Sequence, residues 1–300
     1  MNTYLECIPC FFRQALDIAR ISGAEERVQK NILDDTAGAV IDFSLDQTPP
    51  EMALIIHGIV KNHTGLEDPY RQLKIKSNTL AMRLLPQVQR QIDQSSDRLF
   101  TACELAILGN VIDYGAKNSL DVEKELDDMV ARKNGKRNQP GELFDYQAFR
   151  EALFKHQKIL YLADNAGETA FDKLLIQEIK RLDPSKKIIY AVKEKPIIND
   201  ALREDALFCG IDEVADIISS GADVPGTVLS RCSESFRDLF YKADMVISKG
   251  QGNFEALSKV NREIFFLFKA KCPVLARHVG SELGAVVLKH HRGEDSSASS

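Results

Sequence analysis

The sequence lacks several features that would assign it to a specialised class of protein. It contains no run of about 18 apolar residues, so we expect no membrane-spanning segment. It has no basic run, and a net charge of −5 is not typical of a nucleic-acid-binding protein. Residues 1–7 do not form a charged segment followed by an apolar one, so no secretory signal is predicted. Six cysteines without such a signal favour reduced thiols and a cytoplasmic protein.

Metal-ligand motifs made of cysteine and histidine are also scarce. Cys7 and Cys10 form a single Cys-X-X-Cys motif, whereas a structural zinc site would need two further ligands. A thioredoxin-like redox site would need a preceding strand, but this motif opens a helical region. Two partly buried thiols near a helix start explain the motif at least as well as a functional pair. The six histidines show no spacing typical of metal ligands.

What the sequence does contain is an ordinary composition, 44% hydrophobic and 28% charged, over enough residues for two domains. Amphipathic patterns predict helices up to about residue 155. Besides a helix near residues 11–19, they cover residues 25–43, 50–63, 69–92, 97–114 and 120–130. We therefore predict a helical N-terminal domain over residues 1–155.

From residue 158 the pattern changes to short apolar runs that alternate with helices. Strands are predicted at residues 158–163, 187–192, 213–218, 245–248, 264–268, 273–276 and 285–288. Helices are predicted between several of them, including residues 168–182 and 196–208. This alternation predicts an α/β domain over residues 156–291, with a mostly parallel sheet between two helical layers. Residues 292–300 are polar and are predicted to form a mobile tail.

The most informative segment follows the first of these strands. Residues 164–168 read Asp-Asn-Ala-Gly-Glu, and ligands of open α/β sheets bind where parallel strands end. Asp164 and Asn165 offer the oxygen ligands that Mg²⁺ or Mn²⁺ prefers. The alternative is that one of them caps the next helix. The residues alone do not decide between these two interpretations.

The second strand ends in a similar way, with Asn199 and Asp200 ahead of a predicted helix. Asp200 could complete a metal site with Asp164 and Asn165, because neighbouring parallel strands present their ends to one crevice. A helix cap is again the alternative. The third loop, residues 219–227, could form an anion-binding nest or a plain surface loop.

The fourth strand leads into residues 249–253, Lys-Gly-Gln-Gly-Asn. Gly250 and Gly252 would let backbone amides approach a ligand, and Lys249 adds a charge suited to a phosphate. The spacing is not that of a Walker A loop. In the helical half, residues 109–113 read Gly-Asn-Val-Ile-Asp. They form either a C-cap turn or a part of the ligand cleft at the sheet edge, and in the second case Asn110 would line it.

Taken in order, these motifs resemble the DUF89 family of metal-dependent damage-control phosphatases. The matching segments are residues 109–113, 164–168, 195–200 and 249–255, and the resemblance covers residues 1–289. Cys7 and Cys10 suggest the short prokaryotic branch of that family. The resemblance implies a three-layer, Rossmann-like α/β/α domain joined to a helical N-terminal domain.

The resemblance also implies roles for individual residues. Asp164, Asn165 and Asp200 would hold a divalent metal ion (Mn²⁺, Ni²⁺, Co²⁺ or Mg²⁺). Lys249 would bind the substrate phosphate, and the further candidates for substrate binding are Gly250, Gly252, Asn253 and Asn110. Catalytic roles are predicted for Asp164, Lys249 and Glu168, with Asp164 or Glu168 orienting a water molecule.

These residues predict hydrolysis of small phosphomonoesters such as sugar phosphates or damaged phosphometabolites. Attack by water and a phospho-aspartyl intermediate both remain open. Two alternatives belong to other classes. One is a methyltransferase that uses S-adenosylmethionine, and the other is a phosphate-ligand sensor without catalysis. The oligomeric state, the native metal and the particular substrate are not predicted.

Overall fold

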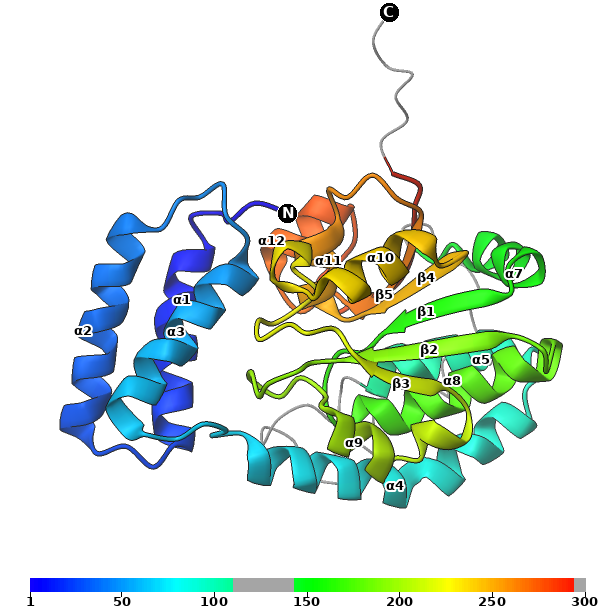
Figure 1. Cartoon of the computed structure of the whole chain (residues 1–300), viewed down its shortest axis with the longest axis horizontal. Coiled ribbons are helices and arrows are strands. Elements are labelled where there is room, and N and C mark those ends of the chain that lie inside the picture. Colours follow the sequence, from blue (N-terminus) through cyan, green and yellow to red (C-terminus); the bar gives the residue numbers. More distant parts are fainter. Residues whose placement is uncertain (110–142, 294–300) are drawn as a thin grey trace, which may run out of the picture.

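The structure is a computed structural model that describes residues 1–109 and 143–293. Its helices and strands follow the chain in the order shown in Figure 1. The N-terminal half contains α1 (Cys7–Ile21), α2 (Glu26–Asp42), α3 (Pro49–Thr64), α4 (Arg71–Asp93), α5 (Arg98–Leu108) and α7 (Tyr146–Lys155). The remainder contains β1 (Lys158–Leu162), α8 (Glu168–Leu182), β2 (Lys187–Val192), α9 (Arg203–Phe208), β3 (Asp216–Ser219), α10 (Glu234–Lys242), β4 (Met245–Lys249), α11 (Gln251–Leu257), β5 (Ile264–Lys269), α12 (Pro273–Val279) and β6 (Val286–His291).

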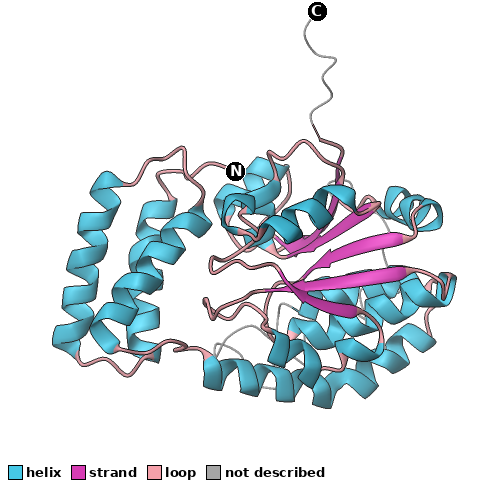
Figure 2. Ribbon diagram, in the orientation of Figure 1, coloured by secondary structure: helices cyan, strands magenta, loops and turns pink. Residues whose placement is uncertain are grey.

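The strands form one sheet in the order β3-β2-β1-β4-β5-β6. All pairs are parallel except β5 with β6 (Figure 2). The chain moves outward from β1 through β2 to β3 and then returns to β4, which pairs with the other side of β1. The strand order therefore reverses between β1 and β4, and this switch point is where an open α/β sheet leaves a crevice for a ligand. The predicted α/β fold class is confirmed.

Two hydrophobic cores cover the two faces of the sheet, because successive strand residues point to opposite sides. Ile159 and Tyr161 of β1 pack with apolar residues of α4, α5, α7 and α8. Leu160 and Leu162 pack on the other face with apolar residues of α10, α11 and α12. Every residue of β4 is buried, as expected for a strand between two layers of helices.

Helices α1, α2 and α3 form a separate group, drawn in blue at one side of the sheet in Figure 1. They share their own core, which includes Phe11, Ile32, Ile56 and Tyr70. Helices α4, α5 and α7 belong instead to the core beneath the sheet. The division of the chain at residue 155 stays a prediction, but the packing shows that the helical half contributes directly to the α/β core.

Three predicted elements differ in the structure. Residues 273–276 begin helix α12, not a strand, because a proline at the first helical position suits a helix start and four apolar residues do not distinguish the two. The predicted helix at residues 196–208 is restricted to α9, from residue 203. The third strand starts at Asp216, since residues 211–213 form a 3₁₀ turn. The predicted helix at residues 120–130 and the end of the one at 97–114 lie outside the described residues, as does most of the predicted tail.

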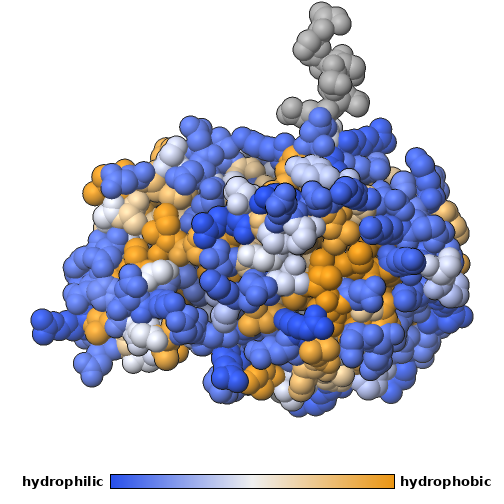
Figure 3. All heavy atoms as spheres, in the orientation of Figure 1, coloured by the Kyte–Doolittle hydropathy of each residue, from blue (hydrophilic) through white to orange (hydrophobic). Residues whose placement is uncertain are grey.

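The described helices include none that is both long and apolar enough to cross a membrane. In the space-filling view, hydrophilic side chains occupy much of the visible face, with apolar areas between them (Figure 3).

Replacing Phe149 by alanine tests whether α7 belongs to the same cooperative unit as the sheet. The Phe149 side chain is fully buried, and its ring centre lies 5.5 Å from that of Phe265 in β5. We expect Phe149→Ala to lower the free energy of unfolding by about 3–5 kcal/mol, measured by urea denaturation. Phe154→Ala is the matched control, because Phe154 lies on the same helix and is 60% exposed. Equal losses in the two variants would contradict this packing.

Candidate active site

The loop after β1 places Asp164 and Asn165 at the switch point, and neither of them caps the following helix. Helix α8 begins at Glu168, its N-cap is Gly167 with φ of 85°, and no side chain caps it. Instead, the Gly167 N–H donates to Asn78 Oδ1 of α4 over 2.7 Å. The helix-cap interpretation of Asp164 and Asn165 is therefore wrong. Both side chains are nearly buried at the start of the helix.

The loop that carries Asp200 runs beside the loop that carries Asp164. Asn165 and Asp200 form an isolated antiparallel bridge. The Ala166 N–H donates to Asn199 O over 2.9 Å, and the Ala201 N–H donates to Asp164 O over 2.8 Å. Asp200 does not cap α9, which starts three residues later and whose first turn supplies Asp205 Oδ2 to the Leu202 N–H. The three predicted metal ligands are thus brought together by backbone pairing.

Gly250 makes room for the Asp164 carboxylate. Its φ of 82° is a conformation that L side chains rarely adopt, and a Cβ atom placed on it would lie 2.0 Å from Asp164 Cγ. Its N–H donates to Leu267 O in β5 over 2.9 Å. The structure therefore gives Gly250 a steric role at this site. The predicted approach of a ligand to the amides of Gly250 and Gly252 stays a prediction.

Lys249, the last residue of β4, is buried among carboxylates. Its Nζ lies 3.0 Å from Glu168 Oε2 and 2.7 Å from Asp172 Oδ1. Burial lowers the pKa of Lys249, but the charges of Asp172 and Glu168 outweigh this effect, and the pKa is raised above its ordinary value. Asp172 and Glu168 therefore stabilise the charged form of Lys249 at the end of β4.

Two buried phenols complete the surroundings of Lys249. Tyr161 donates to Asp172 Oδ1 over 2.7 Å, and Tyr190 donates to Asp172 Oδ2 over 2.8 Å. Burial and the Asp172 charge raise the pKa of both phenols well above its usual value, so both remain donors. Asp172 is held by three donors and in turn fixes the position of the Lys249 ammonium group.

The site contains more buried negative than positive charge. Its nearly or fully buried acidic and basic side chains, besides the two phenols, are four carboxylates and two lysines, which leaves a formal charge of −2: Asp164, Glu168, Asp172, Asp200, Lys193 and Lys249. Burial raises the pKa of Asp164 well above its ordinary value, and repulsion from Glu168 and Asp200 raises it further. Burial likewise raises the pKa of Glu168, although Lys249 opposes the shift. A divalent cation is the species that would match this charge.

The residues fit such a cation in the chemistry of their donors. Asn165 Nδ2 donates to Asp164 Oδ2 and to Glu168 Oε1, both over 2.9 Å, so an N–H donor lies between two carboxylates. A half-turn of that amide would present its oxygen instead. Within residues 1–109 and 143–293, no three His, Cys, Asp or Glu side chains are arranged as a metal site. The predicted set contains an asparagine and so is not such a group, and the buried carboxylates of Asp164, Glu168 and Asp200 do not form one either.

The loop after β3 packs against the loop after β4. Lys193 Nζ donates to Gly226 O and lies 3.5 Å from Asp200 Oδ2. Thr227 donates to Asn253 Oδ1 over 2.7 Å, while Asn253 Nδ2 donates to Lys249 O and Ala163 O. The Asn253 side chain thus ties the ends of β1 and β4 to this loop. Its predicted contact with substrate stays untested.

Sequence reasoning missed Asp172, Lys193 and Lys271. Asp172 lies four residues after Glu168 and hence on the same face of α8, which is a signal that the sequence did contain. Lys193 directly follows β2. Lys271 is exposed after β5, and its charge lowers the pKa of Asp164 and Glu168, against the larger effect of burial. No local pattern marks Lys271.

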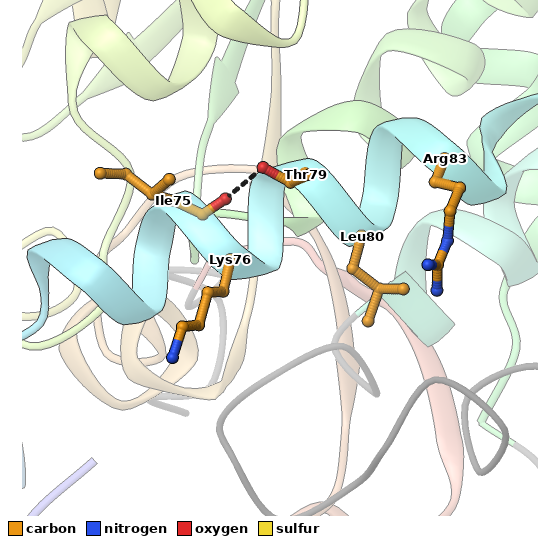
Figure 4. Close-up of a pocket in the computed structure, with 5 residues that line it drawn as sticks. All are labelled: Ile75, Lys76, Thr79, Leu80 and Arg83. Atoms are coloured by element: carbon orange, nitrogen blue, oxygen red, sulfur yellow. Dashed lines mark hydrogen bonds between the residues drawn. The ribbon is translucent and has the colours of Figure 1, made fainter.

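Some predicted residues remain apart from this group. Asn110 lies outside the described residues, although the preceding Gly109 packs closely on Phe171 of α8. Cys7 is buried and Cys10 is exposed at the start of α1, and both are free thiols. A surface pocket on α4 involves none of the predicted site residues. Figure 4 shows its lining: Ile75, Lys76, Thr79, Leu80 and Arg83.

A Rossmann-like sheet with acidic side chains and a lysine at its switch point places this chain among the α/β proteins whose ligands bind at that edge. Comparison with known proteins gives the family. Residues 3–287 match the model of the damage-control phosphatase ARMT1-like domain, so the chain belongs to this family, also called DUF89. The predicted family is confirmed. The assignment to the branch with the Cys-X-X-Cys motif stays a prediction.

Relatives from archaea align along nearly the whole chain. Damage-control phosphatase PH1575 of Pyrococcus horikoshii is 32% identical, with 97% of this chain and 99% of that protein covered. A damage-control phosphatase of Archaeoglobus fulgidus is also 32% identical, with 94% and 97% covered. Uncharacterized protein MJ0202 of Methanocaldococcus jannaschii is 36% identical, with 94% and 93% covered. The crystal structure of PH1575, described as a DUF89 family protein, superposes with a TM-score of 0.86 at 31% identity, covering 97% of this chain and 99% of that one.

Replacing Gly250 by alanine tests the close approach to Asp164. We expect Gly250→Ala to lower the free energy of unfolding by at least about 3 kcal/mol, because both its backbone conformation and its Cβ atom conflict with the fold. Gly280→Ala is the control: its φ is 78°, but nothing lies within 4 Å of the added Cβ atom. It should cost only the strain of the left-handed conformation, about 1–2 kcal/mol. Thermal denaturation compares the two, and an equal loss would contradict the steric role of Gly250.

Proposed function

We propose that the protein is a metal-dependent phosphatase that hydrolyses small phosphomonoesters. The observation that carries this proposal is the buried cluster at the switch point, where carboxylates outnumber lysines at the edge of the sheet that binds ligands. Membership of the damage-control phosphatase family supports the reaction class. The names of two relatives, both damage-control phosphatases, support damaged phosphometabolites as substrates, and sugar phosphates are the second substrate class that we propose.

In this proposal Asp164, Asn165 and Asp200 hold one divalent ion, Mn²⁺, Ni²⁺, Co²⁺ or Mg²⁺. When bound, the ion polarises a phosphoryl oxygen and lowers the pKa of a coordinated water. The bridge between Asn165 and Asp200 fixes the spacing of the ligands. The N-terminus of α8 adds a partial positive charge beside them, which favours anions.

The remaining residues orient the substrate and the attacking group. An ammonium group has three donors, and two of those on Lys249 reach Glu168 and Asp172. We assign the third to a phosphoryl oxygen, where it would stabilise the charge that develops in the transition state. In this proposal Glu168 or Asp164 orients a water molecule. The exposed Lys271 is placed to attract an anionic substrate.

Removing the Asp164 carboxylate should abolish the activity. We expect Asp164→Ala to reduce Mn²⁺-stimulated release of phosphate from an aryl phosphate by at least about 100-fold. Asp238→Ala is the control, since Asp238 pairs with Lys242 on the exposed face of α10. Full activity in Asp164→Ala would refute the assignment. A panel of sugar phosphates and divalent metals would then identify the preferred pair.

Replacing Asp164 by the neutral asparagine should separate the effect of its charge on stability from its effect on metal binding. The pKa of Asp164 is raised in the folded state, so ionising this carboxyl costs more there than in the unfolded chain, where water surrounds it. At neutral pH this difference lowers the free energy of unfolding. Metal-free Asp164→Asn should therefore be at least as stable as the metal-free wild type. Mn²⁺ at 100 times its Kd should stabilise the wild type by about 2.7 kcal/mol and the variant much less. Differential scanning calorimetry with and without Mn²⁺ measures both effects, and an equal response to Mn²⁺ would contradict the predicted ligand.

A further inference from the structure

Ile198 has an unusual backbone conformation two residues before Asp200. Its φ is 37°, and in the described part of the chain no other residue besides glycines has a positive φ. Such a value is unfavourable for any L residue and especially for a β-branched one. Strained residues persist only where their surroundings hold them, and they cluster at functional sites. The contacts of Ile198 therefore indicate which groups fix the backbone of the loop that carries Asp200.

The group that holds Ile198 comes from the N-terminal helices. The Ile198 N–H donates to His57 Nε2 of α3 over 3.0 Å, a contact between residues 141 positions apart. The His57 ring stacks on Tyr70, with ring centres 5.9 Å apart and planes inclined by 22°. Burial lowers the pKa of His57 to about 4, although Asp68 opposes the shift, so the ring is neutral at neutral pH and Nε2 accepts a hydrogen bond.

The side chain of Ile198 makes a second contact with the same helices. It is half-buried and packs against the apolar core of α1, α2 and α3. The residues that follow it continue directly into the site. The Asp200 N–H donates to Ile197 O over 3.1 Å, and Asn199 O accepts from Ala166 N–H beside Asp164. A change in the backbone at Ile198 would therefore move Asp200 relative to Asp164.

We propose that His57 is a positioning residue that acts through Ile198, so that the helical group α1–α3 sets the geometry of the metal site. This inference rests on the proposed function, because it takes Asp200 as a metal ligand. It assigns no contact with substrate or metal to His57. It also gives α1–α3 a role in the site, although most of their buried apolar residues belong to a core of their own.

The test measures the Kd for Mn²⁺ from the electron paramagnetic resonance signal of the free ion, and the Tm without metal. His57→Phe keeps a ring beside Tyr70 but removes the acceptor, and it should weaken Mn²⁺ binding about fivefold or more. His57→Gln restores an acceptor at a similar reach and should bind Mn²⁺ nearly as the wild type does. His63→Phe is the matched control, because His63 lies on the same helix and contacts Asp35 of α2.

A double variant tests the route through the backbone. Asparagine tolerates a positive φ, so Ile198→Asn in the His57→Phe background should restore Mn²⁺ affinity toward that of the wild type. Absence of restoration would overturn the proposed action through Ile198. Unchanged Mn²⁺ affinity in His57→Phe would overturn the whole inference and leave the phosphatase proposal intact. A wild-type protein that neither binds Mn²⁺ nor hydrolyses phosphate esters would overturn both.

Discussion

The structure of the site depends on one electrostatic constraint, the excess of buried carboxylates at the carboxyl ends of β1 and β2 and on the first turns of α8. Burying a carboxylate is costly unless a cation or several donors lie beside it. Lys249 satisfies this need for Glu168 and Asp172, and two tyrosines add donors to Asp172. Burial raises the pKa of Asp164, and repulsion from Glu168 and Asp200 raises it further. The cluster thus keeps its excess negative charge at the edge of the sheet where ligands of open α/β folds bind.

This arrangement requires backbone segments to approach one another unusually closely. Gly250 admits Asp164 because a side chain at position 250 would occupy the place of the carboxylate. Gly226 likewise lies against Gly252 O, where a Cβ atom would come within 2.3 Å. The loops after β1, β3 and β4 are thus locked together by contacts that only glycine permits. Lys193 and Asn253 then fix these loops through hydrogen bonds to backbone carbonyl groups.

The parts of the site that could be predicted from the sequence are those that depend on residues close together in the chain. The apolar run before Asp164 predicted β1, and the helix predicted at residues 168–182 matches α8 at both ends. Strand ends carry ligands in such folds, so Asp164, Asn165 and Asp200 could be proposed together. Position 273 was misassigned because a short apolar run fits both a strand and a helix. His57 could not be found in this way, because its partner lies 141 residues away and the contact is with a backbone N–H.

Two hydrogen bonds from the N-terminal half hold the loops of the site and use uncharged acceptors, in keeping with the excess of negative charge there. Asn78 of α4 accepts the Gly167 N–H next to the loop of Asp164, and His57 of α3 accepts the Ile198 N–H next to that of Asp200. A carboxylate could accept either hydrogen bond more strongly, but it would add negative charge to a cluster that already has an excess. Neutral acceptors make these two contacts without that penalty. The N-terminal helices can therefore fix the loops of Asp164 and Asp200 without adding to the excess negative charge of the site.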